Sequence, residues 1–177
     1  MEVAFTAIGL AALVARLTST LVELLGSCVP DEKEEPMLPG LDEPTSERAE
    51  RRLREEREIW ITTVRSDGQP QASPVGFLWD GAEFLVLSQP GTPKIGNLAG
   101  NPKVAMHLDL DRDSEDGSVL TLEGVATLDG EPLSADEAAT YVDRYQDVIR
   151  AAQLTEQELF AEFSSVIRVR PTRVRFH

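Results

Sequence analysis

The chain has 177 residues, and its 31 acidic side chains outnumber the 17 basic ones, giving a formal charge of −14. A protein that holds a phosphate backbone needs a basic surface, so the charge excludes nucleic acid as a partner and argues against anionic membranes. The length fits one ordinary domain with a hydrophobic core. Cys28 is the single cysteine, so no internal disulfide can form and we expect a reducing, cytoplasmic location. One cysteine and two histidines are too few for a structural zinc site, and no metal is expected.

Residues 1–36 are predicted to precede the folded domain, which we place at residues 37–177. The longest uncharged apolar run near the start, Val3–Ala15, is shorter than the roughly 18 to 20 residues that span a bilayer. A signal peptide opens with basic residues, whereas Glu2 is acidic. Leucines three and four apart favour an amphipathic helix that packs on the domain or on a partner chain. Alternatively, the segment is an upstream extension, because Pro30–Pro44 resembles a linker and Met37 offers a second start.

The domain is predicted to begin with a solvated helix over Ser46–Glu58, where charges of both signs recur at helical spacing. Five strands follow, and the turn residues Asp67-Gly68 and Asp80-Gly81 join the first three as antiparallel hairpins. These strands are expected over Ile59–Val64, Pro70–Trp79, Glu83–Ser88, Lys103–Asp109 and Ser118–Leu128.

A short helix is predicted between the third and fourth strands, where it can close one end of a barrel, and Pro102 ends it. Capping boxes at Ser134 and Thr155 open two more helices, the first reaching about Ala152. The chain then returns to strand over Ser165–Arg170 and Thr172–Phe176. Six or seven antiparallel strands with few helices predict a mainly β fold, a small barrel with flanking helices.

Familiar catalytic patterns are scarce: the sequence has no nucleophile elbow, Walker loop or dinucleotide glycine motif. His107 alternates along a strand with Ala105 and Asp109, which favours an ordinary sheet-face histidine over a catalytic base. The acidic loop Asp109–Asp116 has carboxylates at every second position but lacks the glycine and glutamate of a calcium loop. A solvated surface loop is the favoured interpretation.

The stretch Ser88–Asn97 is the most informative for function. Thr92, Lys94 and Asn97 surround the start of the short helix, whose free N–H groups and dipole favour an anion. Lys94 is one of four basic residues between Ile59 and Asp129, against ten acidic ones. A lysine in that setting predicts a specific phosphate or carboxylate contact, the alternative being a lysine that faces water.

Pro74 gives a second indication, because it removes a ladder donor from an otherwise central strand, which should be bulged or exposed there. A bulge beside Gly76 would let a flat ligand lie against the backbone. Trp60 and Trp79 are expected in the core or at a dimer interface. The last twelve residues carry no acid and four arginines, which could add to an anion site: Arg168, Arg170, Arg173 and Arg175.

These motifs, in this order and spacing, resemble the pyridoxamine 5′-phosphate oxidase-like split-barrel proteins, in particular the actinobacterial flavin/deazaflavin oxidoreductases. The resemblance covers Ile59–Leu128 and the closing Val166–Phe176. It is carried by Ile59–Val75, Phe84–Ser88, Lys94–Leu98, Asn101-Pro102 and Leu122–Ala126.

The resemblance implies an FMN-binding type of split barrel that forms a homodimer, with two sites at the subunit interface for FMN or coenzyme F-420. By motif position, the phosphate-bearing tail would be held by Ser88, Thr92, Lys94 and Asn97. The backbone around Ser73, Pro74, Val75 and Gly76 would face the ring. Such enzymes need no catalytic side chain, because the protein orients a hydride transfer between the ring and a small organic acceptor.

Coenzyme F-420 is the expected cofactor, because Pro93-Lys94 stands where FMN oxidases of the family often have an Arg-Lys pair. Two alternatives remain open: an FMN-dependent enzyme of the pyridoxamine-phosphate-oxidase type, and a non-catalytic module that binds a flavin, a deazaflavin or haem. The resemblance does not indicate the substrate.

Overall fold

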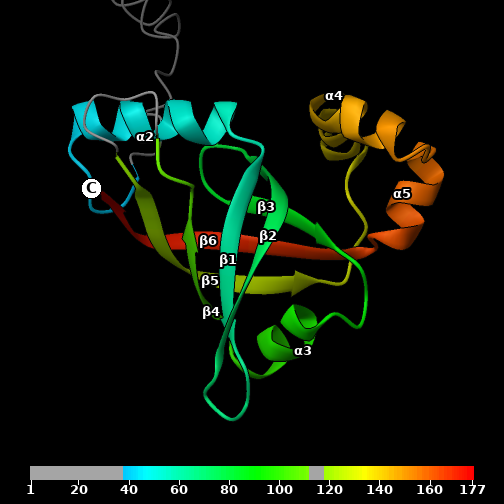
Figure 1. The fold of residues 1–177 in the computed structure, drawn as a ribbon, viewed down its shortest axis with the longest axis horizontal. Helices are drawn as coiled ribbons and strands as arrows, with labels where there is room; N and C mark the ends of the chain where they lie inside the picture. The colour runs from blue at the N-terminus through cyan, green and yellow to red at the C-terminus, as the bar shows by residue number, and fades with distance from the viewer. Residues whose placement is uncertain (1–37, 112–117) are drawn as a thin grey trace, which may run out of the picture. The chain divides into compact units, whose positions relative to one another are not determined.

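The computed structural model describes residues 38–111 and 118–177, which form a closed barrel of six antiparallel strands with flanking helices (Figure 1). The predicted fold is confirmed. The predictions for residues 1–36 and for most of the acidic loop lie outside the described residues. Within these residues, no helix is long and apolar enough to cross a membrane.

The first three strands form the predicted meander: β1 (Glu58–Val64), β2 (Pro70–Trp79) and β3 (Phe84–Ser88). Gly68 and Gly81 adopt positive φ in the two hairpin turns. Two further strands, β4 (Lys103–His107) and β5 (Leu120–Asp129), are each slightly displaced from the predicted bounds. The strand order is β1-β2-β3-β6-β5-β4, and β4 closes the barrel by pairing with β1.

The last strand, β6 (Ser165–Phe176), is a single continuous strand, so the two strands predicted there are wrong. Pro171 does not break it, because the pairing with β5 shifts register at this point: Glu123 lies opposite Arg173, and Gly124 lies opposite Pro171. Thr172 is the extra residue, and its hydroxyl donates to the carbonyl of Glu123 at 3.2 Å. A β-bulge thus accommodates the proline inside the sheet.

Two helices pack against the ends of the barrel, above and below it in Figure 1. Helix α2 (Glu43–Glu55) starts three residues before the predicted helix, because the Asp42 carboxylate caps the N–H of Thr45. Its buried Leu53 joins the barrel core. Helix α3 (Pro93–Gly100) contributes Leu98 to the same core, as expected for a helix that closes one end.

The remaining helices, α4 (Ala135–Ala151) and α5 (Glu156–Glu162), begin at the predicted capping boxes of Ser134 and Thr155. They form a second apolar cluster outside the barrel, where buried residues of α4 and α5 pack on β3 and β6. Members of this cluster are Leu85, Leu87, Tyr141, Tyr145, Ile149, Leu159 and Val166.

Candidate cofactor-binding site

The candidate site lies where β2 loses its second partner strand. Strand β2 pairs with β1 from Pro70 to Gly76, but its pairing with β3 covers only Phe77–Trp79. The same register, if continued, would place Ser88 opposite Val75. Pairing stops before that point, so the backbone of Ser73–Gly76 forms part of a sheet edge that faces the end of β3.

Pro74 lies on this edge, and the predicted bulge is wrong. The β1–β2 register runs through it without a shift, with Trp60 opposite Pro74. In an antiparallel sheet, every second residue of a strand points its backbone N–H and C=O toward the same neighbouring strand. At Asp80, six residues after Pro74, that side is the β3 side, because the Asp80 N–H donates to the Glu83 carbonyl. The Pro74 nitrogen faces this side too, where pairing has ended, so its missing N–H costs no ladder bond. The other expectation, exposure at Pro74, is confirmed.

Three of the predicted site residues come together at the end of β3. The Ser88 and Thr92 hydroxyl oxygens are 3.0 Å apart, and the Lys94 ammonium donates to Ser88 Oγ at 3.4 Å. The Ser88 and Thr92 hydroxyl oxygens both lie within hydrogen-bond distance of the Gln89 carbonyl oxygen, at 3.3 and 3.2 Å, and would have to rotate toward a ligand. No side chain of the described residues caps the first turn of α3. Two hydroxyls and one ammonium therefore converge beside an uncapped helix start, a donor set suited to phosphate.

Lys94 is half-buried and makes no ion pair within residues 38–111 and 118–177. Burial lowers its pKa, because the charged form loses hydration without gaining a carboxylate. A bound anion would reverse this effect. In a chain of charge −14, an uncompensated cation is the strongest local indication of an anionic ligand.

Asn97 lies one turn further along α3 and faces another way. Its amide nitrogen donates to Thr63 Oγ1 at 2.9 Å and to Gln71 Oε1 at 3.0 Å, so it ties α3 to β1 and β2. Its donor group is thus already used inside the chain. The structure does not bring Asn97 into the cluster of Ser88, Thr92 and Lys94.

The predicted residues of the Ser73–Gly76 edge differ in whether a side chain or only the backbone can contact a ligand. Val75 is buried with its side chain in the barrel core, so only its backbone can serve a ligand. Ser73 is partly exposed. The outer side of Gly76 is not open to a flat ligand as predicted, since a Cβ there would lie 3.1 Å from the Tyr145 hydroxyl and 3.3 Å from that of Tyr141.

The two tyrosines were missed by the sequence reasoning, although their i, i+4 spacing on α4 placed them on one helix face. Tyr145 has a structural role where β1 and β2 diverge. Its hydroxyl accepts from the Phe77 N–H at 2.7 Å and donates to the Arg57 carbonyl at 2.6 Å. It thereby satisfies backbone groups that the ladder no longer pairs.

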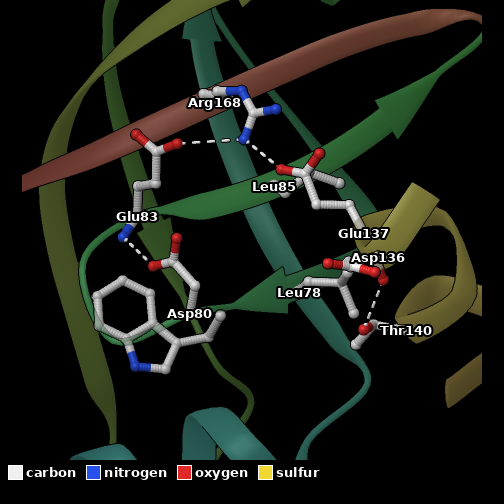
Figure 2. A pocket seen from close by; sticks show the side chains of 9 residues that line it. Leu78, Asp80, Glu83, Leu85, Asp136, Glu137, Thr140 and Arg168 are labelled. Carbon is white, nitrogen blue, oxygen red and sulfur yellow. Dashed lines mark hydrogen bonds and ion pairs between the residues drawn. The ribbon is translucent and has the colours of Figure 1, made fainter. Parts of the chain in front are cut away.

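The prediction that Arg168 adds positive charge to an anion site is not supported by its contacts. Arg168 bonds to Glu137 at 2.8 Å and to Glu83 at 3.2 Å (Figure 2), and also to Asp129 at 2.8 Å. The hydrogen bond from Arg168 lowers the pKa of Glu137 to about 2. These carboxylates neutralise the arginine. Arg175 is likewise paired with Glu123 at 2.6 Å, while Arg170 and Arg173 are exposed.

A pocket of about 240 Å³ lies beside this ion cluster, between the start of β3 and the first two turns of α4. Figure 2 shows the side chains that line it. Ser88 lies at the opposite end of β3, so the pocket does not coincide with the predicted phosphate cluster. Its lining is acidic and apolar apart from one arginine and one threonine: Leu78, Trp79, Asp80, Glu83, Leu85, Asp136, Glu137, Thr140 and Arg168.

The sequence profile of the family described as pyridoxamine 5′-phosphate oxidase matches residues 45–177. The chain belongs to this family. Membership in the pyridoxamine 5′-phosphate oxidase family, which includes oxidoreductases, agrees with the closed barrel. No curated protein matches the chain closely enough to count as a relative.

Solved structures of the pyridoxamine 5′-phosphate oxidase type are similar in fold. HutZ, the haem storage protein from Vibrio cholerae, is 22% identical, with a TM-score of 0.56 over 74% of this chain and 92% of its own. A FAD-binding protein from Mesorhizobium loti is 16% identical, with a TM-score of 0.53 over 74% and 90%. An F420 reductase is 23% identical, with a TM-score of 0.50 over 83% and 98%. At these identities the likeness establishes the fold alone.

Proposed function

We propose that this protein is an oxidoreductase that binds coenzyme F-420 and transfers a hydride between the deazaflavin and a small organic acceptor. The observation that carries the proposal is the Lys94 cluster: an uncompensated, half-buried ammonium next to two hydroxyls and an uncapped helix start. This donor set fits the phosphate-bearing tail of a flavin-type cofactor.

The choice of F-420 over FMN rests on Pro93. Proline has no cationic side chain and no N–H, so the cluster offers one positive charge where FMN oxidases of the family often offer two. Structures of similar fold include both an F420 reductase and a FAD-binding protein, so the fold is compatible with either type of cofactor. The first alternative is an FMN-dependent enzyme of the pyridoxamine-phosphate-oxidase type.

In this proposal the protein binds and orients the cofactor and the acceptor, and none of its side chains takes part in the reaction. Ser88, Thr92 and Lys94 hold the tail, and the Ser73–Gly76 edge supplies backbone groups to the ring. When bound, the cofactor supplies hydride chemistry at its ring. The chain's own contribution is to fix the distance between ring and acceptor and to exclude water between them.

Side-by-side titration of the purified protein with F-420 and FMN, followed by fluorescence, tests the cofactor. We expect F-420 to bind with a dissociation constant of about micromolar order and FMN to bind more weakly. Tighter FMN binding, or a yellow protein as isolated, would support the FMN enzyme. If neither binds, the proposal is wrong.

Steady-state turnover separates an enzyme from a carrier. With reduced F-420 as donor, we expect reduction of a quinone, an enone or a nitro compound. Binding of F-420 without turnover of any of these acceptors would instead support a non-catalytic module. The haem storage protein of similar fold makes haem titration the natural parallel measurement.

The proposal includes a homodimer, because the outer face of β1, β4 and β5 carries apolar groups at the surface. Trp60 stacks on His107 with ring centroids 6.1 Å apart, and Val125 on the neighbouring strand is 42% exposed. We expect sedimentation velocity to give twice the 19.4 kDa chain mass. Trp60→Arg should yield monomers, whereas Val148→Arg on the exposed side of α4 should not. A monomeric wild type would refute the dimer, and a dimeric Trp60→Arg variant would place the interface elsewhere.

A further inference from the structure

Tyr141 has a buried ring and a hydroxyl that the described residues leave without a hydrogen bond. The residue is only 9% exposed. Its hydroxyl oxygen is nevertheless not fully enclosed by protein and keeps some contact with solvent. Tyr145, one turn along α4, uses its hydroxyl fully on the backbone of Phe77 and Arg57. The two tyrosine rings pack with their centroids 4.6 Å apart. Of their two hydroxyls, only that of Tyr145 bonds to the backbone.

The position of this hydroxyl connects it to the candidate site. It lies 3.3 Å from the point where a Cβ of Gly76 would stand, at the end of the Ser73–Gly76 edge. A glycine at position 76 leaves room for the phenol to approach the strand so closely. The apolar side chains of Leu85 and Leu87 flank the tyrosines in the same cluster, which holds the ring in place.

We propose that the Tyr141 hydroxyl, on its solvent-facing side, donates a hydrogen bond to the carbonyl oxygen of a quinone or enone acceptor bound beside the Ser73–Val75 part of this edge. The inference rests on the proposed function and names a substrate-positioning residue for it. Negative charge develops on the acceptor oxygen as electrons arrive, and a fixed donor stabilises that charge. The proton stays on Tyr141 throughout.

The chemistry of the phenol is consistent with this role. Burial is the main cause that raises the pKa of Tyr141, and the neighbouring Tyr145 adds to it. The group is therefore a neutral donor at physiological pH. Because the ring is packed, the hydroxyl is already oriented and little rotamer entropy is lost when an acceptor binds.

The test compares Tyr141→Phe with Tyr145→Phe in the full chain. For Tyr141→Phe we expect an unchanged melting temperature and unchanged F-420 affinity, but a kcat/KM for menadione lowered about tenfold, the effect of one lost hydrogen bond. Tyr145→Phe should lower the melting temperature, because it leaves the Phe77 N–H and the Arg57 carbonyl unpaired. Equal menadione kinetics in wild type and Tyr141→Phe would overturn the proposal.

A cofactor-free measurement keeps this result separate from the proposed function. The protein is labelled with 3-fluorotyrosine, and the ¹⁹F signal of Tyr141 is assigned by its absence in Tyr141→Phe. We expect 2-cyclohexen-1-one, a soluble enone, to shift this signal while the Tyr145 signal stays in place. No shift with the enone overturns the Tyr141 proposal. Failure to bind either F-420 or FMN overturns only the proposed function, because the enone shift does not require a cofactor.

Discussion

Replacing Lys94 by alanine should weaken F-420 binding by about tenfold or more, the effect of losing one charge-assisted hydrogen bond. Lys94 contributes an ammonium that no carboxylate of the described residues neutralises. The loss should appear in the dissociation constant measured by fluorescence titration. The melting temperature should change little, because the side chain's one hydrogen bond within the described residues is a long one, 3.4 Å to Ser88.

Lys103→Ala is the matched control, since it removes the same charge from an exposed lysine at the start of β4. It should leave binding within about twofold, as expected for a surface charge outside the site. The pH dependence gives a second readout. Burial lowers the pKa of Lys94, so wild-type binding should weaken as pH rises through that value, and Lys94→Ala should lack this component. Equal affinity of Lys94→Ala and wild type would refute the site assignment.

Replacing Gly124 by alanine should destabilise the barrel by about 1 to 3 kcal/mol, the usual cost of overpacking a tight core. A Cβ at this position would stand 2.8 Å from Val169 Cγ1 and 2.9 Å from the carbonyl oxygen of Arg170. The second neighbour is backbone and cannot rotate away. Gly124 faces the bulge at Pro171, so relief of the clash would require the β5–β6 register to move.

Urea unfolding of Gly124→Ala and Gly130→Ala provides the comparison. Gly130 follows the end of β5, and a Cβ there would meet no atom within 4 Å. The free energy of unfolding of its alanine variant should therefore stay within roughly 0.5 kcal/mol of the wild-type value, as for surface substitutions generally. If Gly124→Ala unfolds at the same midpoint as Gly130→Ala, the bulge has room that the structure does not show.

The sequence was sufficient where the signals were local. The glycine turns at Gly68 and Gly81 predicted the hairpins, and the capping boxes at Ser134 and Thr155 predicted the starts of two helices. Pro171 was misjudged, because a proline can end a strand or lie in a bulge, and the sequence cannot distinguish the two without the facing residue. Gly124, on another strand, decides the case.

The candidate site shows the same division between local and long-range information. Ser88, Thr92 and Lys94 lie within seven residues of sequence, and the structure brings them together as predicted. Asn97 belongs to the same stretch, but its partners Thr63 and Gln71 come from strands that no local pattern connects to it. The space beside Gly76 is set by Tyr141 and Tyr145 of α4, more than sixty residues later, and so was not predictable from the edge alone.

The unpaired edge of β2 has a consequence for solubility. An exposed strand edge is a template for β-addition by another chain, and such pairing leads to aggregation. Pro74 stands within this edge with its nitrogen on the open side, so an incoming strand would find no donor there and would meet the pyrrolidine ring. The proline thereby protects the edge against intermolecular sheet growth while leaving it accessible to a small ligand.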